Sequence, residues 1–312
     1  MDNTIFMITE YILIILAVFC FAGQFAFTKL YEGAVKQTAI TTLVMLAVTG
    51  FFGAVMYIFV CNFSVSFSYV SLFWAAFMAV IMIPYYMIGI KVLSLGSLAI
   101  YSMFMMLGGM LVPFFYGVVF LHEELSVWQI VGTVTLTVFI ILQAVWQQPT
   151  DENETQGSDK NKKILFFVLS ILIFIINGMT GVIAKAHQIS QGAVDEASFT
   201  VISCALTAIF SLMLLTFVAL KNRREVLAQM KSMLKIKPIA VMLLIGASAY
   251  TGNFLHLKAA SAVPASVQFP LVSGGVIVIS ALVSFFAFRE KLSKKEWISV
   301  AGAFISTVLF AF

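Results

Sequence analysis

The sequence predicts an all-α integral membrane protein, with ten transmembrane helices arranged as two inverted five-helix repeats. The first observation behind this prediction is composition. Of the 312 residues, 62% are apolar or aromatic and only 10% are charged, whereas about a quarter of a soluble chain is charged. This excludes a soluble enzyme, a disordered chain and a fibrous protein. An outer-membrane barrel would leave about half of its strand positions polar, so spanning helices remain.

The second observation is that apolar segments of spanning length are divided by one polar stretch. A spanning helix needs about 20 apolar residues. The expected helices cover residues 10–30, 38–60, 70–92, 96–121, 127–146, 164–186, 198–220, 237–258, 263–288 and 297–312. The polar stretch 147–163 reads QQPTDENETQGSDKNKK and separates five helices from five. We therefore expect a first repeat over 1–146, a polar linker over 147–163 and a second repeat over 164–312.

The third observation is that short motifs recur in the two halves. KVLS at 91–94 returns as KAAS at 258–261, and HEELS at 122–126 returns as REKLS at 289–293, both 167 positions later. Because five helices is an odd number, consecutive copies enter the membrane in opposite directions. Such inverted repeats are common among secondary transporters.

Two further pairs support the repeat. Ser126 with Gln129, and Ser293 with Glu296, have the spacing of capping boxes, which predicts that each serine starts a helix. The tracts that end in Lys29 and Lys185 match at an offset of 156 positions. The difference between the two offsets falls in the longer loop that follows the seventh helix.

The distribution of basic residues predicts the orientation. Apart from four lysines at or inside helix ends, every basic residue falls in loops that share one face. These residues are Lys36, Lys160, Lys162, Lys163, Lys221, Arg223, Arg224, Lys231, Lys235, Lys237, Arg289, Lys291, Lys294 and Lys295. Basic loops stay in the cytoplasm. We expect a multi-pass protein of the plasma (inner) membrane with both termini extracytoplasmic.

The most basic loop has an apolar pattern of its own. Between residues 222 and 236, apolar side chains recur at helical spacing: Val226, Leu227, Met230, Met233 and Leu234. This pattern predicts a short amphipathic helix on the inner membrane surface. A solvated basic loop is the alternative.

The second half resembles the EamA-type ten-helix branch of the drug/metabolite transporter superfamily. The resemblance rests on HLKAASAVPASVQFPLVSGGVIVISALVSFFAFREKL, from His256 to Leu292. The first half keeps Lys29, the Gly108–Gly109 pair and the Glu123-x-Leu125 exit. Residues 24–33, QFAFTKLYEG, are similar to the first helix of the small multidrug resistance proteins. The resemblance implies alternating access for a small metabolite such as an amino acid or a related organic solute; a multidrug or cation exporter is the alternative.

One departure from that pattern concerns coupling. The small multidrug resistance proteins carry a membrane-embedded glutamate two turns before the lysine that matches Lys29. This chain has Phe21 there, and Asn177 at the corresponding place before Lys185. An intramembrane carboxylate is the usual carrier of a transported proton. The sequence therefore favours facilitated diffusion or exchange over proton antiport.

Polar residues inside the expected helices are the candidate site. The expected substrate-binding residues are Gln24, Tyr86, Tyr101, Asn177, Thr180, Tyr250, Asn253, Gln268 and Ser273. An unpaired polar group is costly in lipid, so such residues either line a water-filled cavity or bond to neighbouring helices. Glycine and proline on the fourth and ninth helices allow close approach and bending. The expected gating residues are Gly108, Gly109, Pro270, Gly274 and Gly275.

Charged residues near helix ends have two interpretations each. Lys29 and Lys185 could attract an anionic group or extend to the interface. Glu123 and Glu290 are expected to be structural, as a cap or an ion pair. His122 does not begin an H-E-x-x-H motif, and we predict no metal, cofactor or catalytic residue.

The expected partners are a small-molecule substrate and the lipid bilayer, and we expect no nucleic-acid partner. The sequence is compatible with a monomer. The competing function classes are an intramembrane enzyme and a non-transporting scaffold or sensor. No hydrolase-like residue set or paired aspartates lie at membrane depth, which disfavours the enzyme.

Overall fold

The computed structural model describes residues 2–36, 38–120, 122, 126–146, 158–233, 235–260 and 265–309. These residues form eleven helices and contain no strand. The helices are α1 (Asp2–Ala34), α2 (Ala39–Val60), α3 (Tyr69–Leu95), α4 (Leu98–Phe120), α5 (Val127–Trp146), α6 (Ser158–Ile189), α7 (Glu196–Lys221), α8 (Arg223–Met233), α9 (Ile236–Ala260), α10 (Ala265–Phe286) and α11 (Lys294–Leu309).

Many of these helices are long and apolar enough to cross a membrane. In the described part of the chain seven meet both conditions: α2, α3, α4, α7, and the segments Tyr11–Ala34 of α1, Asn161–Ile189 of α6 and Ile236–His256 of α9. Shorter apolar segments occur in α5 (Ile130–Phe139) and α10 (Val272–Phe286). In lipid the backbone must satisfy its own hydrogen bonds, which an α-helix does within one segment. The protein is therefore an all-helical, multi-pass membrane protein.

Local signals set several helix starts. Ser68 caps α3, and its side chain accepts from the Ser71 amide at 3.1 Å. The predicted capping box at the start of α11 is confirmed, because the Glu296 amide donates to Ser293 Oγ at 3.2 Å and the Ser293 amide donates to the Glu296 carboxylate at 2.6 Å. The equivalent prediction at Ser126 cannot be compared, since the side chain of Gln129 lies outside the described part.

The linker and the most basic loop can be compared with the sequence prediction. Helix α6 begins at Ser158, so the last six residues of the expected linker are helical, and residues 147–157 lie outside the described part. Within the loop 222–236, residues 223–233 form α8, so the helical prediction is confirmed and the alternative of a solvated loop is wrong.

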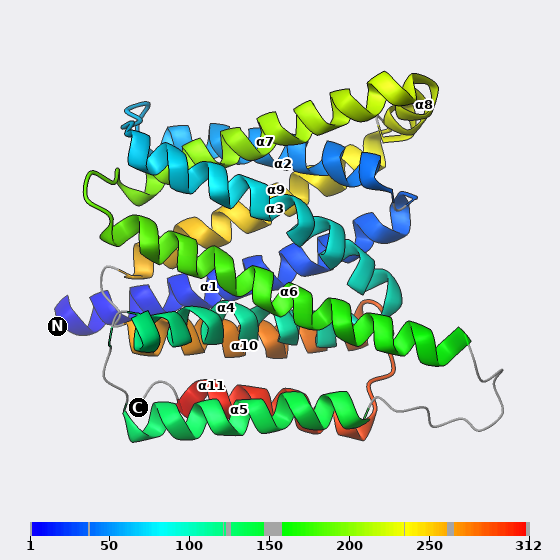
Figure 1. Cartoon of the computed structure of the whole chain (residues 1–312). Helices are drawn as coiled ribbons and strands as arrows, with labels where there is room; N and C mark the ends of the chain where they lie inside the picture. The colour runs from blue at the N-terminus through cyan, green and yellow to red at the C-terminus, as the bar shows by residue number, and fades with distance from the viewer. Residues whose placement is uncertain are drawn as a thin grey trace.

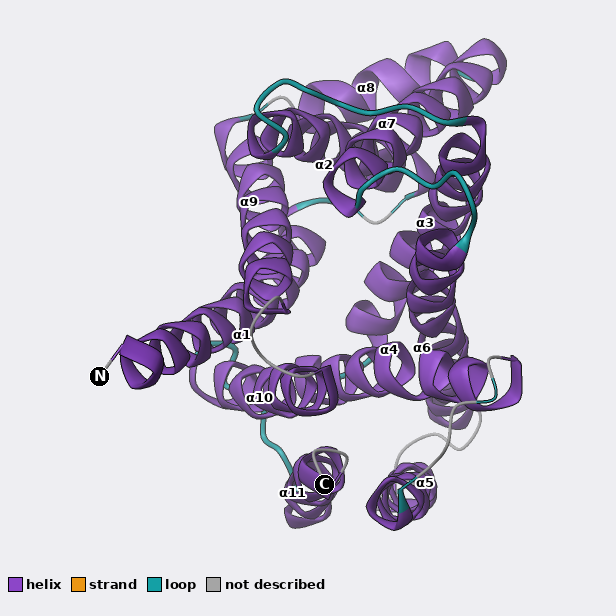
Figure 2. Cartoon of the chain, turned by 90° about the vertical axis from the view of Figure 1, so that its left-hand side faces the viewer, coloured by secondary structure: helices purple, strands orange, loops and turns teal. Residues whose placement is uncertain are grey.

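Eight helices form a closed ring. Each packs on the next in the order α1, α9, α2, α7, α3, α6, α4 and α10, and α10 returns to α1. Figure 2 shows this ring end-on, with α5 and α11 outside it; α11 packs on α10, and α5 packs on α11. Helix α1 starts and α11 ends at the same end of the molecule, on the left of Figure 1, whereas α8, the start of α6 and the α10–α11 loop lie at the right. The basic loops of these segments thus share one end, as the sequence predicts.

Glycines permit the closest contacts in the ring. A Cβ at Gly108 of α4 would overlap the carbonyl of Phe174 on α6, and a Cβ at Gly178 of α6 would overlap Val112 on α4. A Cβ at Gly50 of α2 would lie 2.9 Å from the carbonyl oxygen of Cys204 on α7. Small residues of this kind let membrane helices pack closely.

We expect Gly108→Ala to destabilise the protein by about 1–3 kcal/mol, because the methyl group would meet backbone that cannot rotate away. The measurement is thermal unfolding of the purified protein. Gly33→Ala is the matched control, since a Cβ at Gly33 meets nothing within 4 Å, and alanine favours a helix over glycine. An equal loss in both variants would contradict the packing argument.

Candidate functional site

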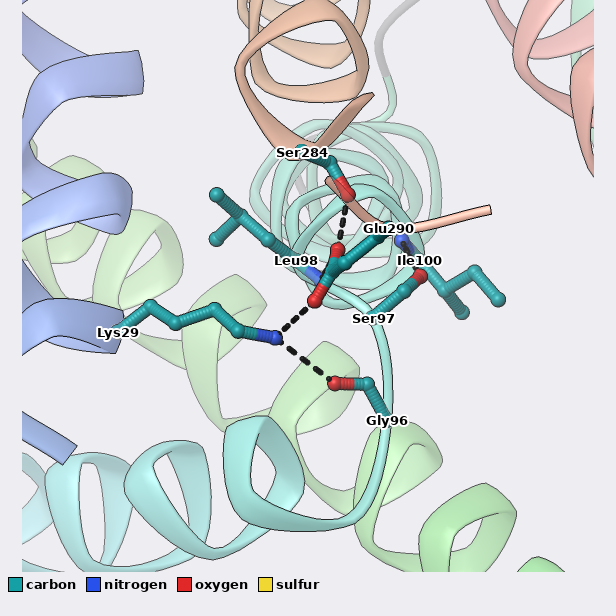
Figure 3. Close-up of polar contacts among 7 residues, drawn as sticks. All are labelled: Lys29, Gly96, Ser97, Leu98, Ile100, Ser284 and Glu290. Carbon is teal, nitrogen blue, oxygen red and sulfur yellow. Dashed lines mark hydrogen bonds and ion pairs between the residues drawn. The ribbon is translucent and has the colours of Figure 1, made fainter. Parts of the chain in front are cut away.

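A buried ion pair joins the two halves of the chain at the α8 end. Lys29, in the last turns of α1, pairs with Glu290 in the α10–α11 loop, and both side chains are largely buried, at 14% and 19% exposed. The Lys29 ammonium also donates to the carbonyl of Gly96 at 3.2 Å (Figure 3). Of the two interpretations of Lys29, the structure supports attraction to an anionic group, and the predicted ion pair of Glu290 is confirmed.

The Glu290 carboxylate has three different donors. Besides Lys29, it accepts from the Ser284 hydroxyl near the end of α10 and from the Leu98 amide at 3.1 Å (Figure 3). Leu98 is the first residue of α4, so the carboxylate also lies at the positive end of that helix dipole. The aromatic ring of Phe288 lies 5.7 Å from the ammonium. This network, Lys29 with Glu290, Ser284, Gly96 and Leu98, is called the latch below.

The latch has the features that an ion pair needs in a low-dielectric environment. Removing two charges from water is costly, and their attraction compensates only when further hydrogen bonds satisfy the remaining lone pairs. Arg289 precedes the carboxylate with a left-handed φ of 53°, which turns the chain after α10. The latch connects α1, the α3–α4 corner and the end of α10, three segments that must separate if this end of the ring opens.

A second polar cluster gathers tyrosines inside the ring. The Cys204 thiol on α7 donates to the Tyr250 hydroxyl on α9 at 3.4 Å, and the Tyr250 ring meets the Tyr57 ring of α2 edge-on at 6.1 Å. Tyr86 on α3 is half-buried and packs against the apolar core cluster that contains Tyr101. We refer to Tyr57, Tyr86, Tyr101 and Tyr250 as the tyrosine cluster; three of them, Tyr86, Tyr101 and Tyr250, are expected substrate-binding residues.

Tyr101 anchors the cluster to α4. Its side chain is buried, and its ring meets Phe25 of α1 edge-on at 5.7 Å. Its hydroxyl lies over Gly89 of α3, where an added Cβ would come within 2.8 Å of the oxygen. The absence of a side chain at Gly89 therefore makes room for the phenol.

The other expected substrate-binding residues are more scattered. Asn177 on α6 donates to the Met105 carbonyl of α4 at 2.6 Å, which is an interhelical hydrogen bond, and the Thr180 hydroxyl donates to the Asn177 carbonyl. Asn253 is exposed and its amide donates to the Ala249 carbonyl of its own helix at 2.9 Å. Gln24 is half-buried on α1, and Ser273 is buried on α10. The side chain of Gln268 lies outside the described part.

The expected gating glycines lie at helix contacts. The Gly108–Gly109 pair faces α6, with the Asn177 amide lying over Gly109. Gly274 packs against Thr307 and Phe304 of α11, and Gly275 packs against Val18 of α1. These glycines provide close packing whether or not the helices move there. The side chain of Pro270 lies outside the described part.

A buried serine–histidine pair at the opposite end was not among the expected sites. Ser71 Oγ accepts from the Val194 amide at 2.9 Å, contacts Ser68 Oγ at 3.0 Å and lies 2.9 Å from His187 Nε2. With both lone pairs of Ser71 Oγ occupied, its proton is directed to Nε2. The His187 proton then sits on Nδ1, which has no described partner. The ring stacks on Phe199 at 3.9 Å.

An acidic cap follows this pair in the chain. Asp195 caps α7 and accepts from the Ser198 amide at 2.9 Å. Partial burial acts to raise the pKa of the Asp195 carboxyl, but hydrogen bonds from Ser198 and Ala197 outweigh it and hold this pKa below its usual range. The carboxylate is thus ionised at neutral pH and complements the positive end of α7.

Comparison with known proteins identifies a fold but no family. No family model matches the chain, and no curated protein matches it. Among solved structures, 26 chains match. One of them, a crystal structure of a protein, has a TM-score of 0.56 with 12% sequence identity and covers 96% of each chain. At that identity the similarity establishes the fold alone.

We expect Lys29 and Glu290 to be energetically coupled. Lys29→Met or Glu290→Gln alone should destabilise the protein by about 3–5 kcal/mol, because either change leaves a buried group without its partner. The double variant should lose less than the sum, with a coupling of about 0.5–3 kcal/mol. Denaturant unfolding in detergent measures this cycle. Lys221→Met with Glu296→Gln is the control pair, whose effects should add. If the effects of Lys29→Met and Glu290→Gln also add, the two residues are not energetically coupled.

Proposed function

We propose that this chain is a secondary transporter of the EamA type in the drug/metabolite transporter superfamily. It would move a small polar or amphipathic metabolite, such as an amino acid or a related organic solute, across the plasma membrane by alternating access. The observation that carries the proposal is the closed ring of eight helices, in which corresponding positions of the two halves pack in corresponding ways around one centre. In this proposal α5, α10 and α11 also span the membrane, giving ten spans.

The order of the ring supports the inverted repeat. The repeat pairs α1 with α6, α2 with α7, α3 with α9, α4 with α10 and α5 with α11. When each helix is exchanged for its counterpart, the ring keeps the same contacts. For example, the contact of α1 with α9 becomes that of α6 with α3, and the contact of α4 with α6 becomes that of α10 with α1. A two-fold axis in the membrane plane has this consequence.

Individual residues follow the same exchange. Gly108 meets Phe174, and Gly275 meets Val18. The two glycines are separated by the 167-position offset of the sequence repeat, and the other two residues by the 156-position offset. His122 and Arg289, again 167 apart, share the left-handed backbone, with φ of 55° and 53°. Few non-glycine residues adopt this conformation, so its recurrence at equivalent turns supports the repeat.

The polar residues also correspond in pairs. At the same two offsets, Gln24 matches Thr180 and Tyr86 matches Asn253. Tyr101 matches Gln268 in the same way. Polar groups at equivalent depths in both halves are the arrangement that a shared midplane site requires. We assign these pairs, with Tyr250 and Ser273, to the substrate pathway.

The latch suggests how one end of the pathway is closed. It holds α1 and the α3–α4 corner to the end of α10 at the α8 end. Opening toward that end requires the pair to separate and both charges to meet water or another partner. A two-state element of this kind can be biased by a ligand only if the ligand binds the two states differently.

The alternative, a multidrug or cation exporter, is less favoured. Asp and Glu are absent from the central parts of the expected helices. A cation in the pathway would therefore depend on tyrosine faces, with about 0.5–2 kcal/mol per contact. The tyrosine cluster and amide groups match a neutral or zwitterionic solute better.

We expect purified protein in liposomes to exchange a radiolabelled solute identified by thermal-shift screening, with no imposed proton gradient. The reason is that Phe21 and Asn177 occupy the two carboxylate positions. Tyr250→Phe removes a hydroxyl from the tyrosine cluster and should lower the exchange rate, whereas Tyr116→Phe, which alters a tyrosine stacked on Phe120, should not.

A protonophore that abolishes exchange, with recovery on an imposed pH step, would contradict uncoupled transport. If none of the tested solutes is exchanged, the result would favour a non-transporting scaffold or sensor.

The orientation is tested separately. Cysteine is introduced at Ser158 or at Ser66, in a background that lacks Cys20, Cys61 and Cys204. The basic residues of the loops favour a cytoplasmic location for the end of the molecule that carries Ser158. In intact cells we expect a membrane-impermeant thiol reagent to label the Ser66 site and to spare the Ser158 site. The reverse pattern would place both termini inside the cell.

A further inference from the structure

Helix α8 lies where two membrane spans end. It connects α7, whose span ends at Lys221, to α9, whose span begins at Ile236. Figure 1 shows it at the same end as the latch, beyond the end of α7. A helix in this position meets the boundary between lipid headgroups and water.

The apolar stripe of α8 packs against other helices of the protein. Val226 and Met233 are buried, and Val226 packs with Ile40, Leu43 and Leu215 from α2 and α7. A hydrogen bond from the Thr38 hydroxyl to Gln229 Oε1, at 2.5 Å, ties one flank of α8 to the start of α2. The helix is therefore held against the bundle and does not insert into lipid by this stripe. The sequence pattern could not distinguish these two uses.

The remaining face of α8 is cationic. Arg224 and Lys231 lie seven residues apart, on the side opposite the stripe of Val226 and Met233, and both are exposed. Four more exposed cations flank them: Lys221, Arg223, Lys235 and Lys237. Glu225 is the single acidic residue in this stretch of sequence, and its carboxylate accepts from Asn222 and Gln229.

Exposed apolar side chains lie beside these cations. Leu220, Leu227 and Ile236 are 82%, 54% and 88% exposed. The Lys221 ammonium lies over the Phe217 ring at 4.8 Å, near the end of the α7 span. A polyanion dissolved in water would match the cations but leave the leucines and the isoleucine in water. A phospholipid matches both, because its phosphate meets the cations and its acyl chains cover the apolar side chains.

We propose that the surface formed by residues 221–233 and 235–237 binds the headgroups of anionic phospholipids in the leaflet at this end of the protein. The bundle holds α8 in place, so the backbone that carries these cations is already ordered before binding. The proposal requires that this is a membrane protein. It does not depend on the transport activity, the substrate or the inverted repeat.

The test uses the full-length protein in detergent, titrated with phosphatidylglycerol or phosphatidylcholine and followed by native mass spectrometry. We expect preferential binding of phosphatidylglycerol. Each surface cation contributes a factor of about five, so R224Q/K231Q should weaken binding by about 25-fold, while R224K/K231R should retain it. The control K294Q/K295Q removes two exposed cations at the same end of the molecule, and should change the affinity less than twofold.

Three results would overturn the proposal. One is equal affinity for the two lipids, and a second is an equal loss of affinity in the two glutamine variants. The third is displacement of the bound lipid by short-chain RNA at equimolar concentration, which would indicate a general polyanion surface. Thermal unfolding of each variant separates lost binding from lost folding. Counterflow measured on the same variants separates this proposal from the transport proposal, since lipid binding can persist in a protein that transports nothing.

Discussion

The close backbone contact of α4 with α6 at Gly108 is the constraint on which the ring depends. In lipid, helices gain little from hiding apolar surface, so van der Waals contact between well-fitted surfaces holds them together. At Gly108 there is no space for a side chain beside the Phe174 carbonyl, and Gly275 packs closely on Val18 where α10 meets α1. These two contacts join α4 to α6 and α10 to α1, which are connections between the first and second halves. Both contacts are part of the closed ring, and Asn177 forms its hydrogen bond to α4 beside the Gly108 contact.

The latch is a consequence of that closure. Lys29 and Glu290 are 261 positions apart, and they meet because α1 packs on α10 while the α3–α4 corner lies beneath both. The pair is largely shielded from water, and it is stable there because the Leu98 amide and the Ser284 hydroxyl satisfy the carboxylate while Gly96 accepts from the ammonium. Each contact taken alone is modest. Together they connect three segments whose separation would open one end of the ring.

The sequence predicts the helices better than it predicts their contacts. Helix positions follow from local properties: apolar length for α2, and a capping box at Ser293 for α11. The partner of Lys29 is not local. A lysine at a helix end extends to water as readily as it pairs with an acid, and only the three-dimensional arrangement decides between them. The same holds for α8, whose apolar stripe could face lipid or protein.

Other features gave no signal in the sequence alone. Cys204 reads as a small apolar packing residue, and its contact with the Tyr250 hydroxyl depends on how α7 and α9 both border α2. The pairing of His187 with Ser71 needs the end of α6 to lie beside the start of α3. By contrast, the offsets of the proposed repeat already relate Gly108 to Gly275 and Tyr101 to Gln268 in the sequence.

The proposed symmetry is imperfect in a way that bears on the direction of the proposed transport. Tyr86 corresponds to Asn253, and Phe21 corresponds to Asn177. Phe21 meets the His256 ring edge-on, whereas Asn177 forms a hydrogen bond to α4. In a transporter built from inverted repeats, exchanging the conformations of the halves converts the state open to one side into the state open to the other. In the transporter proposed above, unequal side chains at equivalent positions would make those two states chemically different, and the solute would be bound with different affinity from each side. Without a coupled ion this difference cannot concentrate the solute, because a ligand shifts an equilibrium only by its own differential affinity. In the proposed transporter it would change the solute concentrations at which transport saturates on each side, and the solute gradient would set the direction of net flow.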